Sequence, residues 1–362
     1  MPKSKVFMVA GLGFGDEGKG TITEYLTAKE GAKLNVRYNG GAQAAHNVVL
    51  SNGRHHTFSQ FGSGTFQGAA THLSRFMIVD PMALMSEARA LQGLGVSDIL
   101  DRLTIERGAP LITPYHEASN RLREALRGRY KHGSCGIGVG ETVADHVKYG
   151  SALLPTAGDL NLGRAALEQK LAFVQELKIK EFGEEAHIDP LMCVSVSYVA
   201  DLWLEAAKRL RIVDGQFLLD TLPRDGTIIF EGAQGVLLDR TYGFFPHSTP
   251  TNITFDNAYA LLDDLDLNKF DICKVGVIRT YHTRHGAGPL PTEILDSNQA
   301  EGLEEKHNRK DVWQGGFRVG FFDLPLFRYA LDVIGPLDIV AITHIDYLPK
   351  LGQMCDEYKH DG

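Results

Sequence analysis

The densest chemical signal in the sequence is a glycine-rich segment close to its start. Residues 11–21 read GLGFGDEGKGT, and residues 13–20 match the phosphate-loop pattern GxxxxGK(S/T) except at the last position, which is Gly20. Glycines let backbone N–H groups turn toward phosphate oxygens, and Lys19 adds a positive charge. Because position 20 has no hydroxyl, a bound magnesium ion needs another ligand, and Asp16 can supply it. The segment therefore predicts a phosphate-binding loop.

Two other interpretations of the same segment stay open. Residues 13–18 also fit GxGxxG, a dinucleotide loop, which expects an acidic residue about 20 positions later at the end of the second strand. That strand ends beside Arg37 and Asn39 and has no acid there. The other interpretation is a glycine-rich turn without a ligand. The acidic pair Asp16–Glu17 would repel phosphate unless a metal or a proton transfer requires a carboxylate. We favour phosphate binding.

Three further segments place polar residues after apolar runs. Residues 35–49 read NVRYNGGAQAAHNVV, residues 231–239 read EGAQGVLLD, and residues 279–293 read RTYHTRHGAGPLPTE. A histidine that follows a glycine-rich turn, such as His46, can act as a general acid when it lies beside the phosphate loop. Taken alone, His46 is more often a hydrogen-bonded structural histidine. The other two segments shift the balance toward catalysis.

Alternating strands and helices are predicted to position these segments. Apolar, β-branched runs predict strands at 5–10, 34–38, 75–79, 227–230, 272–281 and 337–343, and helices are expected at 20–29, 81–92 and 115–128. The alternation predicts an α/β fold with a mainly parallel central sheet, a phosphate loop after a strand, and helical insertions. We expect a single domain over residues 1–362, with a mostly helical subdomain around 159–222.

Composition excludes several classes of function. The 362 residues carry 37 basic and 45 acidic side chains, a net charge of −8, which disfavours non-specific binding to nucleic acid. The four cysteines form no CxxC pair, as is typical of reduced thiols in a cytosolic protein. No apolar run approaches the roughly 20 residues of a membrane helix, and no signal peptide is recognisable. We expect a cytoplasmic protein that binds no membrane.

Together, these segments resemble the adenylosuccinate synthetase family. The family pattern has a GDEGKG loop, an RYxGGxNAGH segment, a glycine-rich loop, and EGAQG, TRxGxGPxPTE and TKxD segments, and counterparts occur here in that order between Gly13 and Asp346. The chain resembles a short form of the family. The resemblance implies a homodimeric, Mg²⁺-dependent ligase. In this family a nucleoside triphosphate phosphorylates the 6-oxygen of a purine nucleotide, and the amino group of L-aspartate then displaces that phosphate.

The resemblance also implies a role for individual residues. Asp16 matches the aspartate that removes the N1 proton and binds magnesium, and His46 matches the histidine that donates to the leaving diphosphate. Gln234 matches the glutamine that stabilises the 6-oxygen, and the backbone carbonyl of Ala45 matches a second magnesium ligand. The residues that match those lining the transferring phosphates are Gly15, Glu17, Gly18, Lys19 and Gly20.

The segments expected to hold the purine nucleotide depart from the family pattern. Gln43 stands where an asparagine contacts the substrate phosphate, and Ser134 and Cys135 replace two threonines of the glycine-rich loop. Thr249 is the expected threonine contact to the same phosphate. Lys148 stands near the place of an arginine that reaches the substrate of the partner subunit, and it cannot make the bidentate contact of that arginine.

The largest departure lies in the loop expected to bind aspartate. Residues 312–320 read VWQGGFRVG where the family has an arginine-rich run, and only Arg318 is retained as the predicted aspartate contact. The family arginine that contacts both aspartate and the ribose 2′-hydroxyl falls near Gly315, and its loss relaxes the need for a 2′-hydroxyl. The alternative is a shifted loop in which Arg318, Arg309 or Lys310 performs that role.

The segment expected to recognise the donor base is THID, residues 343–346. Asp346 can accept from a guanine edge, whereas His344 replaces a lysine and can stack on any purine, so ATP or dATP joins GTP as a candidate donor. This pattern resembles the phage branch of the family, which couples aspartate to dGMP for 2-aminoadenine DNA. We expect dGMP as the acceptor. An IMP- and GTP-dependent enzyme is the alternative, and a non-catalytic phosphate-loop protein or an NAD-dependent oxidoreductase is more distant.

Overall fold

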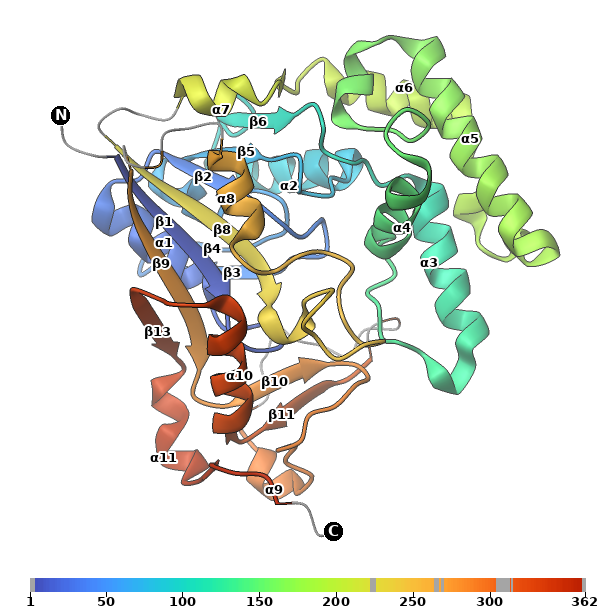
Figure 1. Cartoon of the computed structure of the whole chain (residues 1–362). Coiled ribbons are helices and arrows are strands. Elements are labelled where there is room, and N and C mark those ends of the chain that lie inside the picture. Colours follow the sequence, from blue (N-terminus) through green and yellow to red (C-terminus); the bar gives the residue numbers. More distant parts are fainter. Residues whose placement is uncertain are drawn as a thin grey trace.

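The computed structural model describes residues 4–221, 226–263, 267, 270–303, 313 and 315–359. Its centre is an eight-stranded sheet in the order β13-β9-β1-β8-β2-β5-β6-β7, and every neighbouring pair is parallel (Figure 1). The predicted α/β class is confirmed. The strands are β1 (Ser4–Gly11), β2 (Leu34–Arg37), β5 (Ala70–Leu73), β6 (Leu103–Glu106), β7 (Ile212–Val213), β8 (Thr227–Gly235), β9 (Phe270–Arg279) and β13 (Ile339–Thr343).

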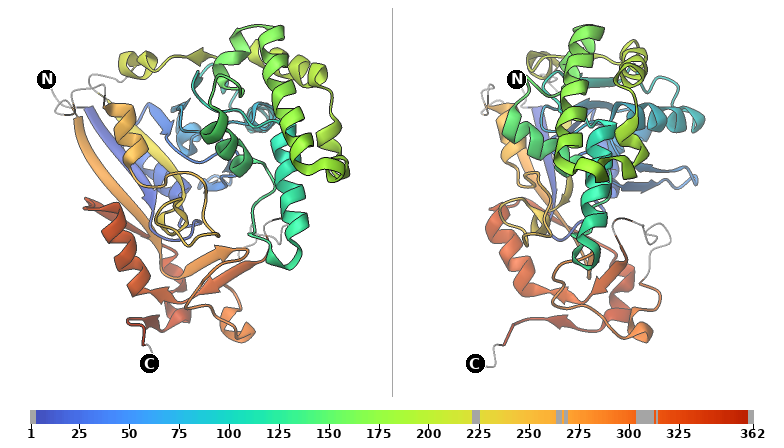
Figure 2. Two further views of the ribbon diagram at one scale, coloured as in Figure 1. Left: turned by 45° about the vertical axis from the view of Figure 1, so that its right-hand side comes forward. Right: turned by 90° about the vertical axis from the view of Figure 1, so that its right-hand side faces the viewer.

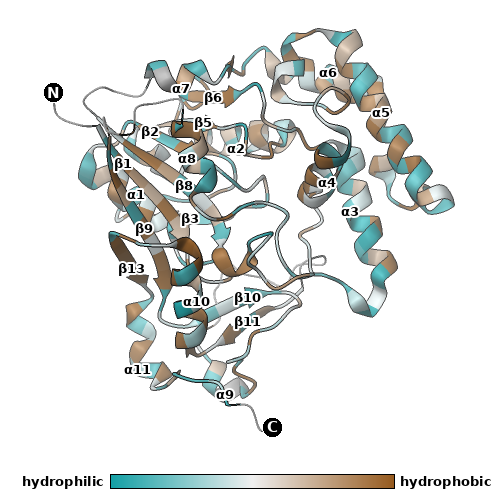
Figure 3. Cartoon of the chain, viewed as in Figure 1, coloured by the Kyte–Doolittle hydropathy of each residue, from teal (hydrophilic) through white to brown (hydrophobic). Residues whose placement is uncertain are grey.

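Helices cover both faces of this sheet, as a parallel sheet requires. Side chains of β1 alternate between two clusters: Val6 and Met8 pack with α8 and α10, whereas Phe7 and Val9 pack with α1. Figure 3 shows the hydrophobic colouring concentrated on the central strands. Because β13, β9, β1 and β8 are parallel neighbours in this order, their carboxyl ends meet at one end of the sheet. The loops that follow these strands carry the candidate site residues described below. The covering helices are α1 (Lys19–Glu30), α8 (Asp256–Leu262) and α10 (Leu324–Ile334).

Four helices, α3 to α6, gather on the side of the molecule away from β13 (Figure 2). Their packing includes a buried ion cluster in which Lys178 lies 3.0 Å from Glu141 and 2.8 Å from Asp145. Within the range 159–222, which was predicted to be mostly helical, helices cover most of residues 159–207, and β7 adds an edge strand. Whether the helices form a subdomain stays a prediction. These four helices are α3 (Pro114–Arg127), α4 (Val139–Tyr149), α5 (Arg164–Phe182) and α6 (Val196–Ala207), and the separate helix α2 spans Pro81–Gly93.

One predicted strand is wrong. Residues 75–79 form a turn and two isolated bridges, and the strand is instead β5, with the sequence ATHL. The polar side chains of β5 concealed it, because a strand buried on both faces is expected to be continuously apolar. Inside the fold the imidazole of His72 bonds Thr104 of the next strand at 2.9 Å. The backbone N–H of Arg75 bonds Glu106 at 2.9 Å and holds the turn.

Three smaller strand pairs accompany the main sheet. Two antiparallel pairs, β3–β4 and β10–β11, and the parallel pair β12–β14 lie outside the main sheet. Within the described residues, no helix is long and apolar enough to cross a membrane. The remaining elements are β3 (His46–Val49), β4 (His55–Phe58), β10 (His282–His285), β11 (Phe317–Gly320), β12 (Phe322–Asp323), β14 (Met354–Cys355), α7 (Gln216–Thr221), α9 (Ser297–Ala300) and α11 (Leu348–Leu351).

Candidate active site

The predicted phosphate loop connects β1 to α1, as expected. Inside the loop the carboxylate of Glu17 accepts hydrogen bonds from the backbone N–H groups of Gly13 (3.0 Å) and Gly15 (2.8 Å) and from Lys19 Nζ (2.5 Å). Glu17 is almost fully buried. Its side chain thus orders the loop and neutralises Lys19, and the other backbone N–H groups of the loop and the start of α1 are left as candidate phosphate contacts.

Strained backbone marks three of the predicted residues. Among the described residues, three that are not glycine have a positive φ: Asp16 (59°), Gln234 (61°) and His344 (56°). They follow or end β1, β8 and β13, and each conformation costs roughly 1–2 kcal/mol for an L-residue. Such strain persists where the surrounding structure enforces it, commonly at active sites. Asp16, Gln234 and His344 were predicted from the sequence to act in catalysis or binding. They are also the described non-glycine residues that the fold holds in the left-handed conformation.

Asp16 is bound from two sides. His285 Nε2 lies 3.0 Å from its carboxylate oxygen Oδ2, and Arg279 Nη1 donates to its backbone carbonyl at 3.0 Å. Burial alone would raise the pKa of Asp16, but the His285 hydrogen bond and the charges of His285, Arg279 and Lys19 hold it below its ordinary value. The carboxylate is ionised at neutral pH and able to accept a proton or bind a cation. The sequence argument missed both His285 and Arg279, although it quoted their segment.

His46 forms a buried pair with a carboxylate that the sequence argument did not assign. Its Nδ1 lies 2.6 Å from Glu231 Oε1, and Glu231 is held by the backbone N–H of Ser63 at 2.9 Å and by the Ser63 hydroxyl. Burial lowers the pKa of His46, although the hydrogen bond to Glu231 acts in the opposite direction. Glu231 orients the imidazole, so the other ring nitrogen is the one left for a ligand. The sequence feature that could have identified Glu231 is its position as the first residue of the EGAQG segment.

Two amide side chains have buried oxygens without a hydrogen-bond partner among the described residues. They are Gln43 Oε1 and Gln234 Oε1, both assigned to the purine nucleotide from the sequence. A buried polar atom without a partner costs roughly 1–3 kcal/mol, and a ligand that bonds it removes that cost. Gln234 also lies against the phosphate loop, because its Cα is 4.0 Å from where a Cβ on Gly15 would stand. Both glutamines therefore fit ligand contacts.

The fold explains why position 20 is glycine. A Cβ at Gly20 would lie 2.8 Å from His46 Cβ, which is shorter than side chains allow. The segment that ends in Ala45 and His46 is thus pressed against the first turn of α1. Position 20 therefore has no side chain because the close packing leaves no room for one. The same close packing brings His46, the predicted general acid, to the phosphate loop.

The donor set fits the magnesium ion that the sequence predicts. Asp16, within the phosphate loop, offers a partly exposed carboxylate, and Ala45, directly before His46, is an exposed residue. Among the described residues no group of three or more His, Cys, Asp or Glu side chains is arranged around a metal position. Mg²⁺ commonly binds through one or two protein oxygens plus phosphate oxygens, so the arrangement suits a metal carried by a nucleotide.

The segments predicted to hold the substrate phosphate come together. His247 Nδ1 lies 3.3 Å from the carbonyl of His132, which joins the loop of Ser134 and Cys135 to the segment of Thr249. Asn120 Nδ2 donates to Ser134 Oγ at 2.7 Å. Cys135 is half-buried, and the Thr249 hydroxyl lies 3.3 Å from that of Thr251. The hydroxyls of Ser134 and Thr249 therefore belong to neighbouring loops. Two residues that contact the same phosphate must be arranged in this way.

Arg318 is held differently from expectation. Its Nε donates to Glu293 Oε1 at 2.8 Å, and its Nη1 donates to the carbonyls of Gly286 (2.9 Å) and Gly288 (2.8 Å). Glu293 neutralises the charge that was expected to attract aspartate. In this arrangement Arg318 orders the β10–β11 hairpin. The alternatives predicted for the role of the missing family arginine, Arg309 and Lys310, lie outside the described residues.

The predicted donor-base segment docks on the phosphate loop. The Thr343 hydroxyl donates to the carbonyl of Glu17 at 2.7 Å and lies 2.9 Å from His344 Nδ1. Burial, followed by the charge of Arg279, lowers the pKa of His344 to about 4, so its ring is neutral at pH 7. Asp346 is exposed beside it. A neutral ring and an exposed carboxylate suit stacking and edge contacts to a base.

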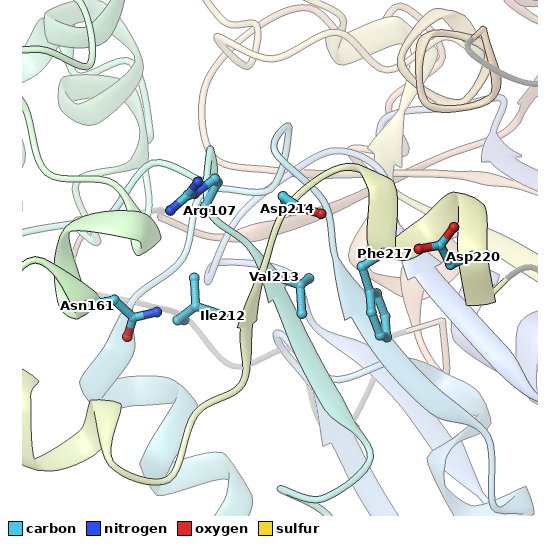
Figure 4. Close-up of a pocket in the computed structure, with 7 residues that line it drawn as sticks. All are labelled: Arg107, Asn161, Ile212, Val213, Asp214, Phe217 and Asp220. Atoms are coloured by element: carbon cyan, nitrogen blue, oxygen red, sulfur yellow. The ribbon is translucent and has the colours of Figure 1, made fainter.

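A pocket of about 340 Å³ lies elsewhere, beside the edge strand β7 (Figure 4). It contains none of the residues predicted for the site. Because β7 and β13 are opposite edges of the sheet, this pocket is remote from the donor-base segment. Its lining residues are Arg107, Asn161, Ile212, Val213, Asp214, Phe217 and Asp220.

Sequence comparisons bear directly on the identity of this site. The family model described as Adenylosuccinate synthetase matches residues 8–362. The adenylosuccinate synthetase of Clostridium botulinum (strain Alaska E43 / Type E3) is 33% identical over 364 residues, which cover 98% of this chain and 82% of that protein. The adenylosuccinate synthetase of Mycobacterium leprae is 34% identical over 351 residues, covering 95% and 77%.

Solved structures show the same fold. The fully ligated adenylosuccinate synthetase from Plasmodium falciparum superposes with a TM-score of 0.82 at 23% identity, covering 95% of this chain and 78% of that one. The cyanophage S-2L succinoaminodeoxyadenylate synthetase, bound to dGMP and dATP as an energy donor, superposes with a TM-score of 0.64 at 20% identity, covering 97% and 90%. The parallel sheet with its phosphate loop, taken with these matches, defines an α/β carbon–nitrogen ligase. The chain belongs to the adenylosuccinate synthetase family.

Proposed function

We propose that this ligase couples L-aspartate to the 6-position of dGMP. The observation that carries the choice of acceptor is the state of Arg318, which is bound to Glu293 and two carbonyls. With Gly315 at the position of the family arginine, the described part of the loop offers no cation committed to a ribose 2′-hydroxyl. A deoxyribonucleotide needs no such contact. The cyanophage neighbour, whose structure holds dGMP, has this fold but is too distant to decide the acceptor.

The first half of the proposed reaction makes the 6-oxygen nucleophilic. Asp16 takes the N1 proton of the purine, and the amide of Gln234 stabilises the negative charge that develops on the 6-oxygen. That oxygen attacks the γ-phosphorus of the triphosphate, and the bond to the bridging oxygen of the diphosphate breaks. Asp16 and the carbonyl of Ala45 would hold Mg²⁺, which neutralises phosphate charge when bound.

The leaving diphosphate takes a proton from His46 in this mechanism. The pKa of His46 is lowered by burial in the free protein, and negative phosphates beside its outer ring nitrogen would raise it again. Glu231, at 2.6 Å, stabilises the resulting imidazolium. The amino group of aspartate then attacks C6 and forms the C–N bond, the C6–O bond to phosphate breaks, and the proton lost by the amino group leaves with the phosphate. The contributions are mainly positioning and charge stabilisation, as in other phosphoryl transfers.

An acceptor panel tests the proposal. The chain is mixed with Mg²⁺ and aspartate and with IMP, GMP, dIMP or dGMP, each in combination with GTP, ATP or dATP. Mass spectrometry then detects the succinyl adduct. We expect kcat/KM for dGMP to exceed that for IMP by at least about 10-fold, or about 1.4 kcal/mol.

Each other outcome of this panel has a defined meaning. An adduct formed mainly from IMP and GTP would overturn dGMP specificity and identify the ordinary purine-biosynthesis reaction. GMP and dGMP reacting equally would refute the argument from the missing 2′-hydroxyl contact. No adduct from any pair would overturn the proposed ligase activity of this chain. Sedimentation of the same sample tests the predicted homodimer.

A further inference from the structure

The contact between Asp16 and His285 joins two parts of the site. His285 ends β10, directly opposite Phe317 of β11, and the two rings lie 5.1 Å apart. Its Nε2 is 3.0 Å from Asp16 Oδ2. Asp16 belongs to the phosphate loop, whereas β10 and β11 form the hairpin that carries Arg318. The His285 imidazole therefore connects the proposed base to the hairpin expected to receive aspartate.

The main chain of Asp16 is fixed independently of its side chain. Arg279, at the end of β9, is buried, and its Nη1 donates both to the Asp16 carbonyl at 3.0 Å and to Thr283 Oγ1 at 3.2 Å. This contact holds the left-handed backbone at position 16. It leaves the orientation of the carboxylate undetermined, and the described contact that sets this orientation is His285.

The direction of the hydrogen bond follows from the chemistry of its partners. An ionised carboxylate only accepts hydrogen bonds, so Nε2 of His285 carries the hydrogen and donates it to Oδ2. With Oδ2 engaged, Oδ1 is the oxygen left to face a ligand. A base is most effective when one of its lone pairs is held toward the proton that it removes.

We propose that His285 is a positioning residue that holds the Asp16 carboxylate with Oδ1 toward the purine N1. This inference rests on the proposed function, because it concerns the same base. The family pattern TRxGxGPxPTE does not specify the residue at the position of His285. Positioning by His285 also means that an ordered β10–β11 hairpin is required before the base is aligned.

Two substitutions separate the hydrogen bond from simple packing. His285→Leu removes the donor, whereas His285→Gln retains an amide N–H near the position of Nε2. We expect His285→Leu to lower kcat by about 10- to 100-fold, with KM for the nucleotide and for aspartate changed by no more than about threefold. His285→Gln should retain kcat within about fivefold of the wild-type chain. His187→Leu, which removes an exposed histidine between α5 and α6, is the matched control and should retain wild-type kcat.

Isotope scrambling isolates the step in which the base acts. A triphosphate labelled with ¹⁸O at the β,γ-bridge is incubated with Mg²⁺ and nucleotide but without aspartate, and reversible phosphoryl transfer moves the label. We expect scrambling to slow in His285→Leu by the same factor as kcat. Unchanged kcat in His285→Leu, or an equal loss in both His285 variants, would overturn the proposal.

Hydrogen–deuterium exchange tests the contact without relying on turnover. Peptides that cover residues 11–20 should exchange faster in His285→Leu than in the wild-type chain or in His285→Gln. Equal exchange in all three chains would show that His285 does not hold the loop. If the wild-type chain forms no adduct, the proposed function fails, and the exchange result still decides the role of His285.

Discussion

At the scale of single residues, the site combines strain with unmet hydrogen bonds. Asp16 and Gln234 adopt left-handed backbone conformations, and the side-chain oxygens of Gln234 and Gln43 have no partner among the described residues. Both features cost free energy in the free protein. In the proposed mechanism, a bound nucleotide recovers part of this cost by supplying the missing partners. The residues proposed for catalysis and nucleotide binding are thus among the least relaxed of the described residues.

Asp16→Asn tests the proposed base directly. Asparagine has nearly the same shape and tolerates a positive φ, so the fold and melting temperature should stay close to those of the wild-type chain. It cannot accept the N1 proton, and we expect kcat to fall by at least about 100-fold. Steady-state kinetics and a thermal melt on the same sample check both statements. Turnover within about tenfold of wild type would transfer the role of base to another group.

At the scale of elements, the site depends on how closely α1 and β3 approach each other. The sequence predicted α1 and its phosphate loop, yet it could not show that His46 lies against Gly20. It also misplaced the strand before α2, because the polar residues of β5 are satisfied only by neighbours distant in the sequence. Local patterns predict a helix or strand well where its buried residues are apolar and recur with the period of that element. They predict it poorly where the buried residues are polar and are satisfied by tertiary hydrogen bonds.

Gly20→Ser restores the hydroxyl of the usual phosphate-loop pattern, and we expect it to be harmful here. Its Cβ would lie 2.8 Å from His46 Cβ and 3.1 Å from the His46 carbonyl carbon. Relieving this overlap should cost about 1–3 kcal/mol of unfolding free energy. The displaced His46 should lower kcat by about 10- to 100-fold. Urea unfolding and kinetics measure the two effects.

Gly93→Ser is the matched control for that substitution. Gly93 ends α2, and a Cβ there would have nothing within 4 Å. We expect stability within about 1 kcal/mol of wild type and unchanged kcat, because serine is favoured over glycine in a helix. If Gly20→Ser behaves like this control, the close approach does not constrain the site.

At the scale of the whole molecule, the sheet buries ionisable groups that the fold must keep neutral or paired. His72 is fully buried in β5, and burial, followed by the charge of Arg75, lowers its pKa to about 4. In the unfolded chain a histidine titrates near 6.5. The folded state therefore binds fewer protons than the unfolded state between these values, and stability falls as the pH drops from about 6.5 toward 4.

His72→Asn should flatten this part of the pH dependence. Asparagine can retain the bond to Thr104 that His72 Nδ1 makes at 2.9 Å, and it has no proton to gain. Between pH 7 and pH 5 the wild-type chain should lose about 2 kcal/mol more unfolding free energy than the variant, given pKa values of about 4 folded and 6.5 unfolded. Urea titrations at both pH values give the difference. Parallel loss in the two chains would show that His72 does not contribute.

The sequence by itself determined the family, the α/β class and the strand-to-helix position of the phosphate loop, because these depend on residue order and local periodicity. It also singled out Asp16, His46 and Gln234. Only the tertiary structure decided which side chains surround them. Glu231 and His285 lie 185 and 269 positions from their partners, and the parallel sheet joins them by placing the carboxyl ends of its strands at one edge. Pairing of Arg318 with Glu293 is likewise a tertiary outcome, since no local pattern encodes the distance between two loops.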